Sequence, residues 1–276
     1  MVRTPNGEKI QKILARRGVG SRRAMEKAIV EGRIHVNGQQ ASLGDRALEQ
    51  DKIEVDGQLV EEHFAPVRVI LYNKPEGQVC TRKDEKGRVT VFADLPKLIK
   101  QRWINIGRLD INTSGLLLFT TDGELANKLM HPSSNIDREY MVRVFGDVTE
   151  ENISAMLNGV ELEDGLARFS DIVEGDNDKG LNKWYTVCLM EGRNREVRRL
   201  WESQDLKVNR LKRVRYGPIF LPSYVRSGQW NDLSSSEIKT LYKSCGLSEP
   251  RLLGPMANDK DRHARHERKL RSRGRR

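Results

Sequence analysis

Apolar residues in the N-terminal part of the chain follow the spacing of two short helices. In residues 8–18 they recur at the i, i+3, i+4 positions of one helix face, and a glycine closes the segment. In residues 21–32, Ser21 is placed to cap a second helix and Gly32 to end it. The side chains expected to face the core of this region are Ile10, Ile13, Leu14, Ala24, Ala28 and Ile29.

Strand patterns follow these helices. Apolar and polar residues alternate in residues 33–41 and again in residues 51–60, which is the period of a half-buried strand. An Asn-Gly pair at 37–38 and an Asp-Gly pair at 56–57 are typical of tight hairpin turns, because both residue types tolerate a positive φ. Two helices and hairpin strands in so short a stretch predict a small α+β module.

The middle of the chain, from about residue 67 to residue 246, contains more strand patterns than helix patterns. The strand-like runs are VRVILYN, RWINIG, GLLLFTT, REYMVRVFG, KWYTVCLMEG and RVRYGPIFL. Helical spacing occurs in GELANKLMH, TEENISAMLNG, NREVRRLWESQ and SSSEIKTLYKSC. Because the two kinds of segment do not alternate regularly, we expect an α+β domain with a mixed or antiparallel sheet and peripheral helices. A doubly wound parallel sheet is not expected.

Positive charge is concentrated at the C-terminal end. The net charge is +10, and residues 251–276 carry ten lysines and arginines against three acidic residues. A basic segment on a nearly neutral body predicts a polyanionic partner, although a solubilising tail is an alternative interpretation. Apolar residues are scarce after Met256, so we predict that this segment is disordered when no polyanion is bound.

Composition excludes several classes of site and location. The three cysteines lie far apart without a CxxC spacing, which argues against a zinc site and against a disulfide framework. The N-terminal residues form no apolar leader, and no run approaches the ~18 apolar residues of a membrane span. Phosphate-binding loops, dinucleotide fingerprints and the HExxH motif are also missing from the sequence. We therefore expect a cytoplasmic protein without a metal or cofactor.

These patterns divide the chain into four parts. Residues 1–64 are the N-terminal module, and residues 65–66 form a linker. Residues 67–246 are the larger domain, and residues 247–276 are the basic, disordered tail.

Arginines flank the turn between the two N-terminal helices. A cluster of this kind is usually a solvated charged face. The pattern KILARRGVGSRR…I..GRI.VNG, however, resembles the small RNA-binding module found in a protein of the small ribosomal subunit. In that family the second helix and the turn before it contact the RNA backbone. The resemblance implies that the RNA contacts are Arg16, Arg17, Ser21, Arg22 and Arg23.

A second cluster of polar candidates borders the predicted strands. The stretch GRLDINTSGLLLFTTDG places Asp110 in a glycine-bordered bend before an apolar strand. An aspartate in such a bend most often accepts main-chain hydrogen bonds in an Asx-turn, so this residue alone does not identify an active site. Further candidates, each with an ordinary structural interpretation of its own, are Tyr140, Arg193, Arg195 and Arg198.

The order of these motifs is more specific than any one of them. GRLD…SGLLL.T.DG.LA..L.HP…..EY.V followed by EGRNREVRR resembles the ribosomal RNA pseudouridine synthases, in particular the group that contains the A enzyme of the small subunit together with the B enzyme of the large one. The resemblance covers residues 8 to about 245. The stretches YNKPEGQVCTR, GRVTVFADLPKL and FTTDGELANKLMHPS look most like the B members of this group. The resemblance implies a cofactor-free enzyme that isomerises a uridine of 23S ribosomal RNA to pseudouridine.

The resemblance also implies roles for the candidate residues. Asp110 corresponds to the family's nucleophile, Tyr140 to the tyrosine that stacks under the base, and Arg198 to the basic residue that pairs with the aspartate. Arg108 corresponds to the residue that fills the gap left by the flipped uridine, and Leu109 to part of the apolar wall behind the aspartate. The remaining substrate-binding candidates are Arg193 and Arg195.

Two alternatives stay open. One is the same reaction at another site, on the small subunit or at a neighbouring uridine of the large subunit. The other is an RNA-binding ribosome assembly factor without catalytic activity. The presence of Asp110, Tyr140 and Arg198 together favours the enzyme, because a binding platform has no chemical need for all three. The expected partner is ribosomal RNA, bound by a monomer, with no membrane or protein partner implied.

Overall fold

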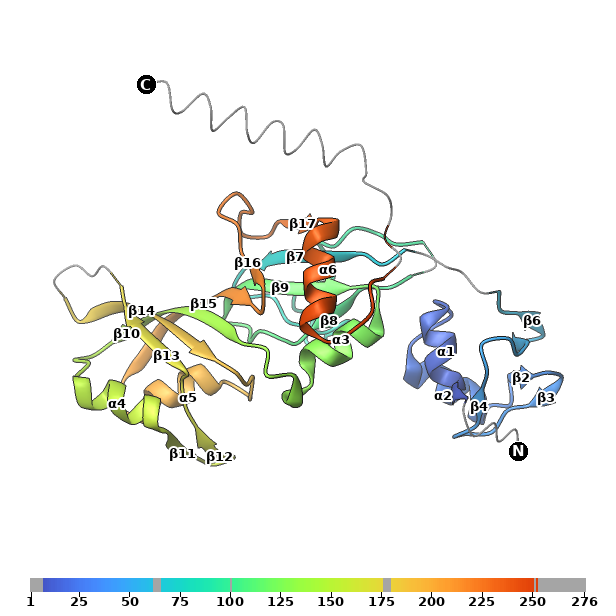
Figure 1. Cartoon of the computed structure of the whole chain (residues 1–276), viewed down its shortest axis with the longest axis horizontal. Helices are drawn as coiled ribbons and strands as arrows, with labels where there is room; N and C mark the ends of the chain where they lie inside the picture. Colours follow the sequence, from blue (N-terminus) through green and yellow to red (C-terminus); the bar gives the residue numbers. More distant parts are fainter. Residues whose placement is uncertain (1–6, 62–65, 100, 176–179, 251, 253–276) are drawn as a thin grey trace, which may run out of the picture. The chain divides into compact units, whose positions relative to one another are not determined.

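The computed structural model describes residues 7–61, 66–99, 101–175, 180–250 and 252 of the chain. These residues form two compact units (Figure 1). The first contains the residues through Pro66 together with Lys97–Trp103 and Thr121–Gly123, and the second contains the others. Part of the predicted linker at 65–66 and most of the predicted tail at 247–276 lie outside the described residues.

The first unit contains two helices and short antiparallel strands. Its helices are α1 (Ile10–Arg16) and α2 (Arg22–Val30), and its strands are β1 (Glu8–Lys9), β2 (Ile34–Val36), β3 (Gln39–Gln40), β4 (Arg46–Ala47), β5 (Ile53–Val55) and β6 (Gln58–Leu59). Four of the strands form a sheet in the order β3-β2-β5-β6. The turn from β2 to β3 has φ of 51° at Asn37 and 79° at Gly38, which confirms the predicted hairpin.

The core of the first unit follows the predicted apolar faces with one exception. Ile10 and Leu14 are fully buried, and Ala28 and Ile29 are nearly so. Ala24 is exposed, so its prediction as a core residue is wrong. Its N–H donates to the Ser21 hydroxyl that caps α2, and this places it on the outside of the first turn. The next residue, a methionine, takes the core position.

The second unit is built on one mixed sheet. Its strands are β7 (Val69–Lys74), β8 (Ile104–Ile106), β9 (Ser114–Thr120), β10 (Arg138–Phe145), β11 (Val160–Leu162), β12 (Gly165–Ala167), β13 (Asp171–Glu174), β14 (Asn182–Leu189), β15 (Lys207–Tyr216), β16 (Ile219–Phe220) and β17 (Trp230–Asp232). Its helices are α3 (Gly123–Met130), the 3₁₀ turn η1 (Pro132–Ser134), α4 (Glu150–Asn158), α5 (Glu196–Glu202) and α6 (Ser235–Ser244). No helix among the described residues has the length and apolar character needed to cross a membrane.

The sheet order is β13-β14-β10-β15-β9-β7-β17, with β8 beside β9 and β16 beside β15. Within the described residues its pairings are antiparallel except that of β15 with β9, which is parallel and only two residue pairs long. The predicted α+β class with a mixed sheet is confirmed. The short pairing needs a glycine, because a Cβ on Gly115 would lie 2.2 Å from the Arg213 carbonyl oxygen.

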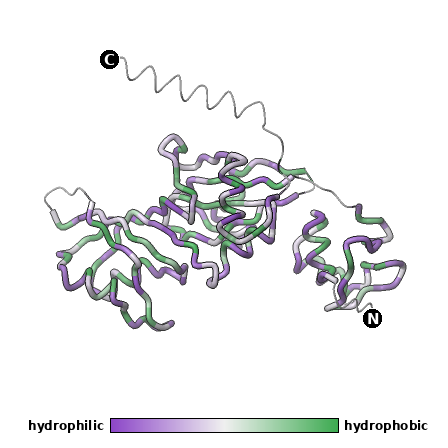
Figure 2. Tube along the Cα trace, viewed as in Figure 1, coloured by the Kyte–Doolittle hydropathy of each residue, from purple (hydrophilic) through white to green (hydrophobic). Residues whose placement is uncertain are grey.

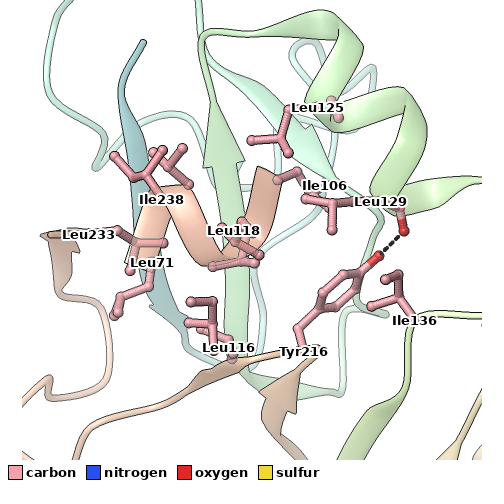
Figure 3. Close-up of a cluster of buried hydrophobic side chains, with 14 of the residues drawn as sticks. Leu71, Ile106, Leu116, Leu118, Leu125, Leu129, Ile136, Tyr216, Leu233 and Ile238 are labelled. Carbon is pink, nitrogen blue, oxygen red and sulfur yellow. Dashed lines mark hydrogen bonds between the residues drawn. The ribbon is translucent and has the colours of Figure 1, made fainter. Parts of the chain in front are cut away.

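Helices cover the two ends of this sheet separately. α3 and α6 pack on β7 and β9, where Leu125 and Leu129 of α3 and Ile238 of α6 share one cluster with Leu116 and Leu118 (Figure 3). α4 and α5 pack on β14 and its neighbours, where the Trp201 and Tyr185 rings are 5.1 Å apart. The strands accordingly contain the green, apolar stretches in Figure 2. The space between the two packed regions is where the site lies.

Candidate active site

A pocket of about 500 Å³ in the second unit contains most of the predicted site residues. Its walls come from the segment after β8, from β10 and β15, and from the turn before α5. The predicted residues that line it are Arg108, Leu109, Asp110, Tyr140, Arg193 and Arg195. Three segments that are far apart in the sequence therefore meet in one cavity.

Asp110 opens the turn that connects β8 to β9. The Thr113 N–H donates to the Asp110 carbonyl oxygen at 3.0 Å, so the main chain closes this turn. Among the described residues, the Asp110 carboxylate has no hydrogen-bond or ion-pair partner, and the half-buried side chain borders the pocket. The ordinary interpretation of this aspartate as an Asx-turn residue is therefore wrong. Its carboxylate is available for chemistry.

The Lys74 side chain is hydrogen-bonded to both ends of this turn. The side chain is fully buried at the end of β7, and its ammonium donates to the carbonyl oxygens of Pro75, Asp110 and Thr113 at 2.9, 3.1 and 2.8 Å. The last two acceptors are the two ends of the turn. Burial lowers the pKa of Lys74, whereas Cys80, Glu76 and Asp110 act in the opposite direction.

The sequence contains a signal for Lys74, which lies in the stretch YNKPEGQVCTR. A single lysine ends a strand that is apolar apart from Asn73, and a proline follows it. A charged residue at the end of a buried strand needs acceptors nearby, since an unpaired buried charge is unfavourable. The position was therefore a candidate for contact with a loop at the same edge of the sheet.

Arg198 lies under the same turn but does not form the expected ion pair. Its guanidinium donates to the carbonyl oxygens of Val208 at 2.8 Å and of Asn112 at 2.9 Å. In the described part of the chain it has no carboxylate partner. The Asn112 contact places Arg198 two residues from Asp110 in the same turn. Burial and Arg195 lower the pKa of Arg198, and Asp110 opposes this shift, so the two charges interact without direct contact.

Tyr140 and Arg213 form a cross-strand pair on the floor of the pocket. Both are buried, with 7% and 2% of their surface exposed, and both line the cavity. The pairing of β10 with β15 shifts register between Glu139 and Tyr140, and such a bulge changes the direction of a side chain. The Arg213 Nε donates to the Leu116 carbonyl oxygen at 2.7 Å, whereas its Nη2 is buried without a described partner.

Sequence reasoning missed Arg213. Its signal was a cation in an alternating strand, at a position that shares its face with the buried Leu211. A buried arginine without a carboxylate leaves donors for a ligand, because its five N–H groups cannot all be satisfied by one carbonyl oxygen.

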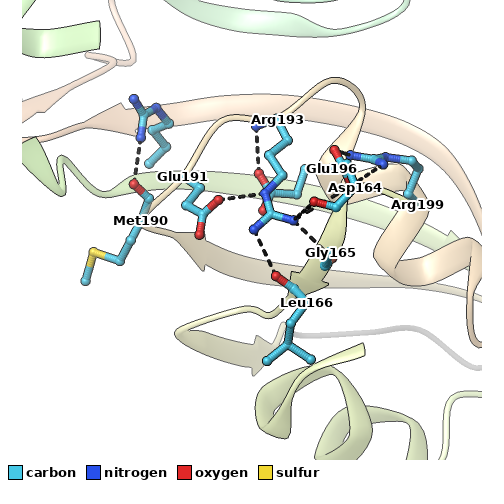
Figure 4. Close-up of polar contacts among 9 residues, drawn as sticks. Asp164, Gly165, Leu166, Met190, Glu191, Arg193, Glu196 and Arg199 are labelled. Carbon is cyan, nitrogen blue, oxygen red and sulfur yellow. Dashed lines mark hydrogen bonds and ion pairs between the residues drawn. The ribbon is translucent and has the colours of Figure 1, made fainter. Parts of the chain in front are cut away.

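Arg193 serves as an internal anchor rather than as a free pocket cation. Its guanidinium donates to the carbonyl oxygens of Asp164, Gly165 and Leu166 in the β11–β12 hairpin and pairs with Glu191 (Figure 4). Its main-chain N–H donates to the buried Glu196 carboxylate. With these donors occupied, the predicted substrate contact of Arg193 is not supported.

Arg108 and Arg195 are the predicted pocket cations that keep exposed side chains. Arg195 has a left-handed backbone, with φ of 49°, at the residue before α5. Its guanidinium is 3.4 Å from the Glu202 carboxylate. Arg108 has no hydrogen-bond or ion-pair partner in the described part of the chain, so its guanidinium can reach a ligand at the mouth of the pocket.

The predicted RNA contacts of the first unit differ in exposure. Arg22 and Arg23 are exposed at the start of α2, and Arg16 is also exposed but pairs with Glu8 at 2.7 Å. Ser21 caps α2. Arg17 is buried, and its guanidinium donates to the carbonyl oxygens of Glu49 and Val60, so its prediction as a phosphate contact is not supported.

Comparisons with known proteins give two family matches. The family model for RNA pseudouridylate synthase matches residues 68–203, and the S4 domain model matches residues 8–53. Among solved structures, one titled "Crystal structure of pseudouridylate synthase" is 25% identical, with a TM-score of 0.60, and the match covers 84% of this chain and 99% of that one.

Curated relatives agree with these matches. A protein of Pseudomonas aeruginosa is 57% identical over 96% of this chain and 69% of its own length. One of Vibrio cholerae is 55% identical over 85% and 74%. One of Salmonella typhi is 52% identical over 92% and 89%. Each is named ribosomal large subunit pseudouridine synthase B.

Proposed function

Because the chain belongs to the RNA pseudouridylate synthase family, we propose that it converts a uridine of large-subunit ribosomal RNA into pseudouridine. The relatives' names support the choice of large-subunit RNA over small-subunit RNA. The observation that carries the catalytic assignment is the Asp110 carboxylate, which has no partner among the described residues and borders the pocket.

The reaction is a redox-neutral isomerisation, and the groups of the pocket suit it. The N1–C1′ bond breaks, the uracil turns, and a C5–C1′ bond forms while C5 loses a proton and N1 gains one. Asp110 is the nucleophile that assists departure of the base. Tyr140 packs against the uracil, and the positive charges of Lys74 and Arg198 lie under the turn that carries the carboxylate.

The target uridine must leave its RNA stack to enter the pocket, because Asp110 is half-buried. Arg108 is exposed at the pocket mouth and takes the position of the flipped base in the stack. Leu109 contributes an apolar wall beside the carboxylate. Arg195 binds a phosphate near the flipped nucleotide, and Arg22 and Arg23 of the first unit bind the RNA backbone.

The enzyme acts as a monomer in the cytoplasm, with ribosomal RNA as its partner. The location follows from the substrate, because ribosomal RNA is present in the cytoplasm.

Asp110→Asn tests the catalytic assignment. The amide keeps the shape of the side chain but is a poor nucleophile, so turnover should fall on the order of 10³-fold or more. The measurement is tritium release from ribosomal RNA labelled at C5 of uridine. Asp122→Asn, at an aspartate that does not line the pocket, is the control and should keep the parent rate.

If Asp110→Asn turns over like the parent, Asp110 is not the nucleophile. If the parent itself releases no tritium but binds the RNA, the assembly-factor alternative replaces the enzyme. Mapping pseudouridines in ribosomal RNA from cells that lack the gene identifies the modified uridine. A modification missing only from small-subunit RNA would contradict the proposed substrate.

A further inference from the structure

The second unit has a sheet face opposite the pocket. Along β10, the buried Tyr140 and Val142 belong to the face that carries the pocket and helix α5. The alternating residues Met141, Arg143 and Phe145 point to the other side, as the two-residue period of a strand requires. Met141 and Phe145 are 40% and 42% exposed, although they lie in the interior of a sheet.

Helices pack on only one side of this part of the sheet. The Trp201 ring of α5 contacts the Tyr185 ring of β14, and α4 lies on the same side, next to Phe169 (Figure 1). No described helix or strand packs on the opposite side. We call this surface the outer basic face and define it by Met141, Arg143, Phe145, Val173, Lys207, Arg210 and Lys212.

The outer basic face carries four cations on two neighbouring strands. Arg143 of β10 is directly opposite Arg210 of β15, Lys212 is opposite Met141, and Lys207 is opposite Phe145. None of the four cations has an ion-pair partner among the described residues. Like charges directly opposite each other destabilise a sheet, so folding alone does not account for this arrangement.

The other end of the same strands shows how such charges are usually neutralised. Arg215 of β15 pairs with Glu139 of β10 at 2.9 Å and also with Asp137. At one end of β10 and β15, positive and negative side chains therefore neutralise each other. At the other end, unpaired positive charges lie beside exposed apolar side chains. A surface of this kind is complementary to a polyanion with apolar faces of its own, which describes the phosphates and bases of RNA.

We propose that the outer basic face is a second RNA-binding surface of the catalytic unit. This inference rests on the proposed function, which supplies RNA as the substrate. Lys207, Arg210, Lys212 and Arg143 contact phosphates, and Phe145 contacts an unpaired base. Because this face and the pocket lie on opposite sides of the sheet, one short hairpin cannot reach both. A long, folded RNA can pass around the sheet and contact the two together.

The test compares two RNAs. One is a full-length transcript of large-subunit ribosomal RNA, and the other is a hairpin of about 25 nucleotides around the modified uridine. Each loss of one phosphate contact reduces the salt dependence of binding by about one charge. For Lys207→Gln/Arg210→Gln we expect binding of the transcript to weaken about tenfold, with a salt slope lower by about two. Binding and tritium release with the hairpin should match those of the parent protein.

Lys239→Gln/Lys243→Gln on α6 is the matched control, because it removes the same charge from another surface of this unit. It should leave the affinity and salt slope for the transcript near those of the parent. Lys207→Glu is a second variant at a single exposed site and should weaken transcript binding further than Lys207→Gln. A melting curve for each protein establishes that it is folded.

Several results would overturn the proposal. An unchanged salt slope for the transcript, or an equal loss with the control variant, excludes a specific contact. If the variant is impaired only on assembled ribosomal particles and not on the protein-free transcript, the partner is a protein. If the parent releases no tritium from either RNA, the proposed function fails, whereas the binding comparison still tests the outer basic face separately.

Discussion

At the scale of single residues, Lys74 is the group on which the position of the candidate nucleophile depends. Its three N–H donors are all used, and two of them hold the ends of the Asp110–Thr113 turn. Lys74→Met keeps the length of the side chain and removes these donors. We expect the free energy of unfolding to fall by about 1–3 kcal/mol because buried carbonyl groups lose their partner. The measurement is a urea titration.

Lys74→Met should lower kcat and leave KM nearly unchanged, because it displaces the Asp110 carboxylate without removing an RNA contact. A misplacement of about 1 Å is enough for a loss of ~100-fold in rate. Lys128→Met, at an exposed lysine of α3, is the control and should change neither quantity. A Lys74→Met protein with the parent kcat would show that the turn keeps its geometry without the ammonium.

Three arginines show where residue-level prediction stops. Arg17 and Arg193 were predicted as ligand contacts and Arg198 as the partner of Asp110. Each instead donates to carbonyl oxygens of its own chain. Some of these acceptors are far away in the sequence, such as the Asn112 carbonyl oxygen that Arg198 contacts. Only the folded chain determines which main-chain carbonyl groups need a side-chain hydrogen-bond donor. The sequence pattern therefore does not reveal these contacts. Arg22, Arg23 and Arg108 are exposed, and their contacts with RNA stay predictions.

At the scale of elements, the pairing of β9 with β15 brings the two sides of the pocket together. Gly115 has a φ of +100°, and a Cβ there would meet the Arg213 main chain. Gly115→Ala must therefore separate the strand after Asp110 from the strand that carries Arg213. We expect a loss of more than about 3 kcal/mol in the free energy of unfolding, together with most of the activity.

Gly180→Ala is the matched control for Gly115→Ala. A Cβ at Gly180 would have no described atom within 4 Å, and its φ is not positive, so the change should stay within about 0.5 kcal/mol. Thermal melting and tritium release measure both variants. Equal stability of the two proteins would mean that the strands tolerate a wider separation than their geometry indicates.

The elements themselves were more predictable than their pairing. Apolar periodicity located the four helices and the six main strands of the second unit, because each buries one face. The β11–β12 hairpin, β13 and β17 were missed, since they are short and not strongly apolar, and only the end of β15 was predicted. The pairing of β15 with β9 could not be predicted from the sequence. It is only two residue pairs long, and the requirement for a glycine at position 115 is evident only once the two strands are seen to lie this close together.

At the scale of the whole molecule, RNA binding is expected to be distributed over several basic regions. The basic end of the chain beyond Pro255 lies outside the described residues, but its charge is a fact of the sequence. Deletion after Pro255 should weaken RNA association and flatten its dependence on salt, because fewer counterions are released on binding. Single-turnover tritium release at saturating protein should stay near the parent rate.

Filter binding at several salt concentrations measures this effect. The identical salt slope with and without the basic end would exclude its contribution to binding. A combined deletion and Lys207→Gln/Arg210→Gln variant should show additive losses, since separate groups of phosphates are involved.

The path of the chain through the sheet has a consequence for how such enzymes diversify. The chain enters the part formed by β10 to β15 at Arg138 and leaves it at Tyr216, and these two residues are cross-strand neighbours. That part is therefore a continuous insertion with adjoining ends. Recombination between related genes at these two positions would exchange the segment from Arg138 to Tyr216 and would preserve the strand order of both parents. Asp110 lies outside this segment and Tyr140 lies within it, and both line the pocket. Each chimera would therefore combine the candidate nucleophile of one parent with the pocket floor of the other.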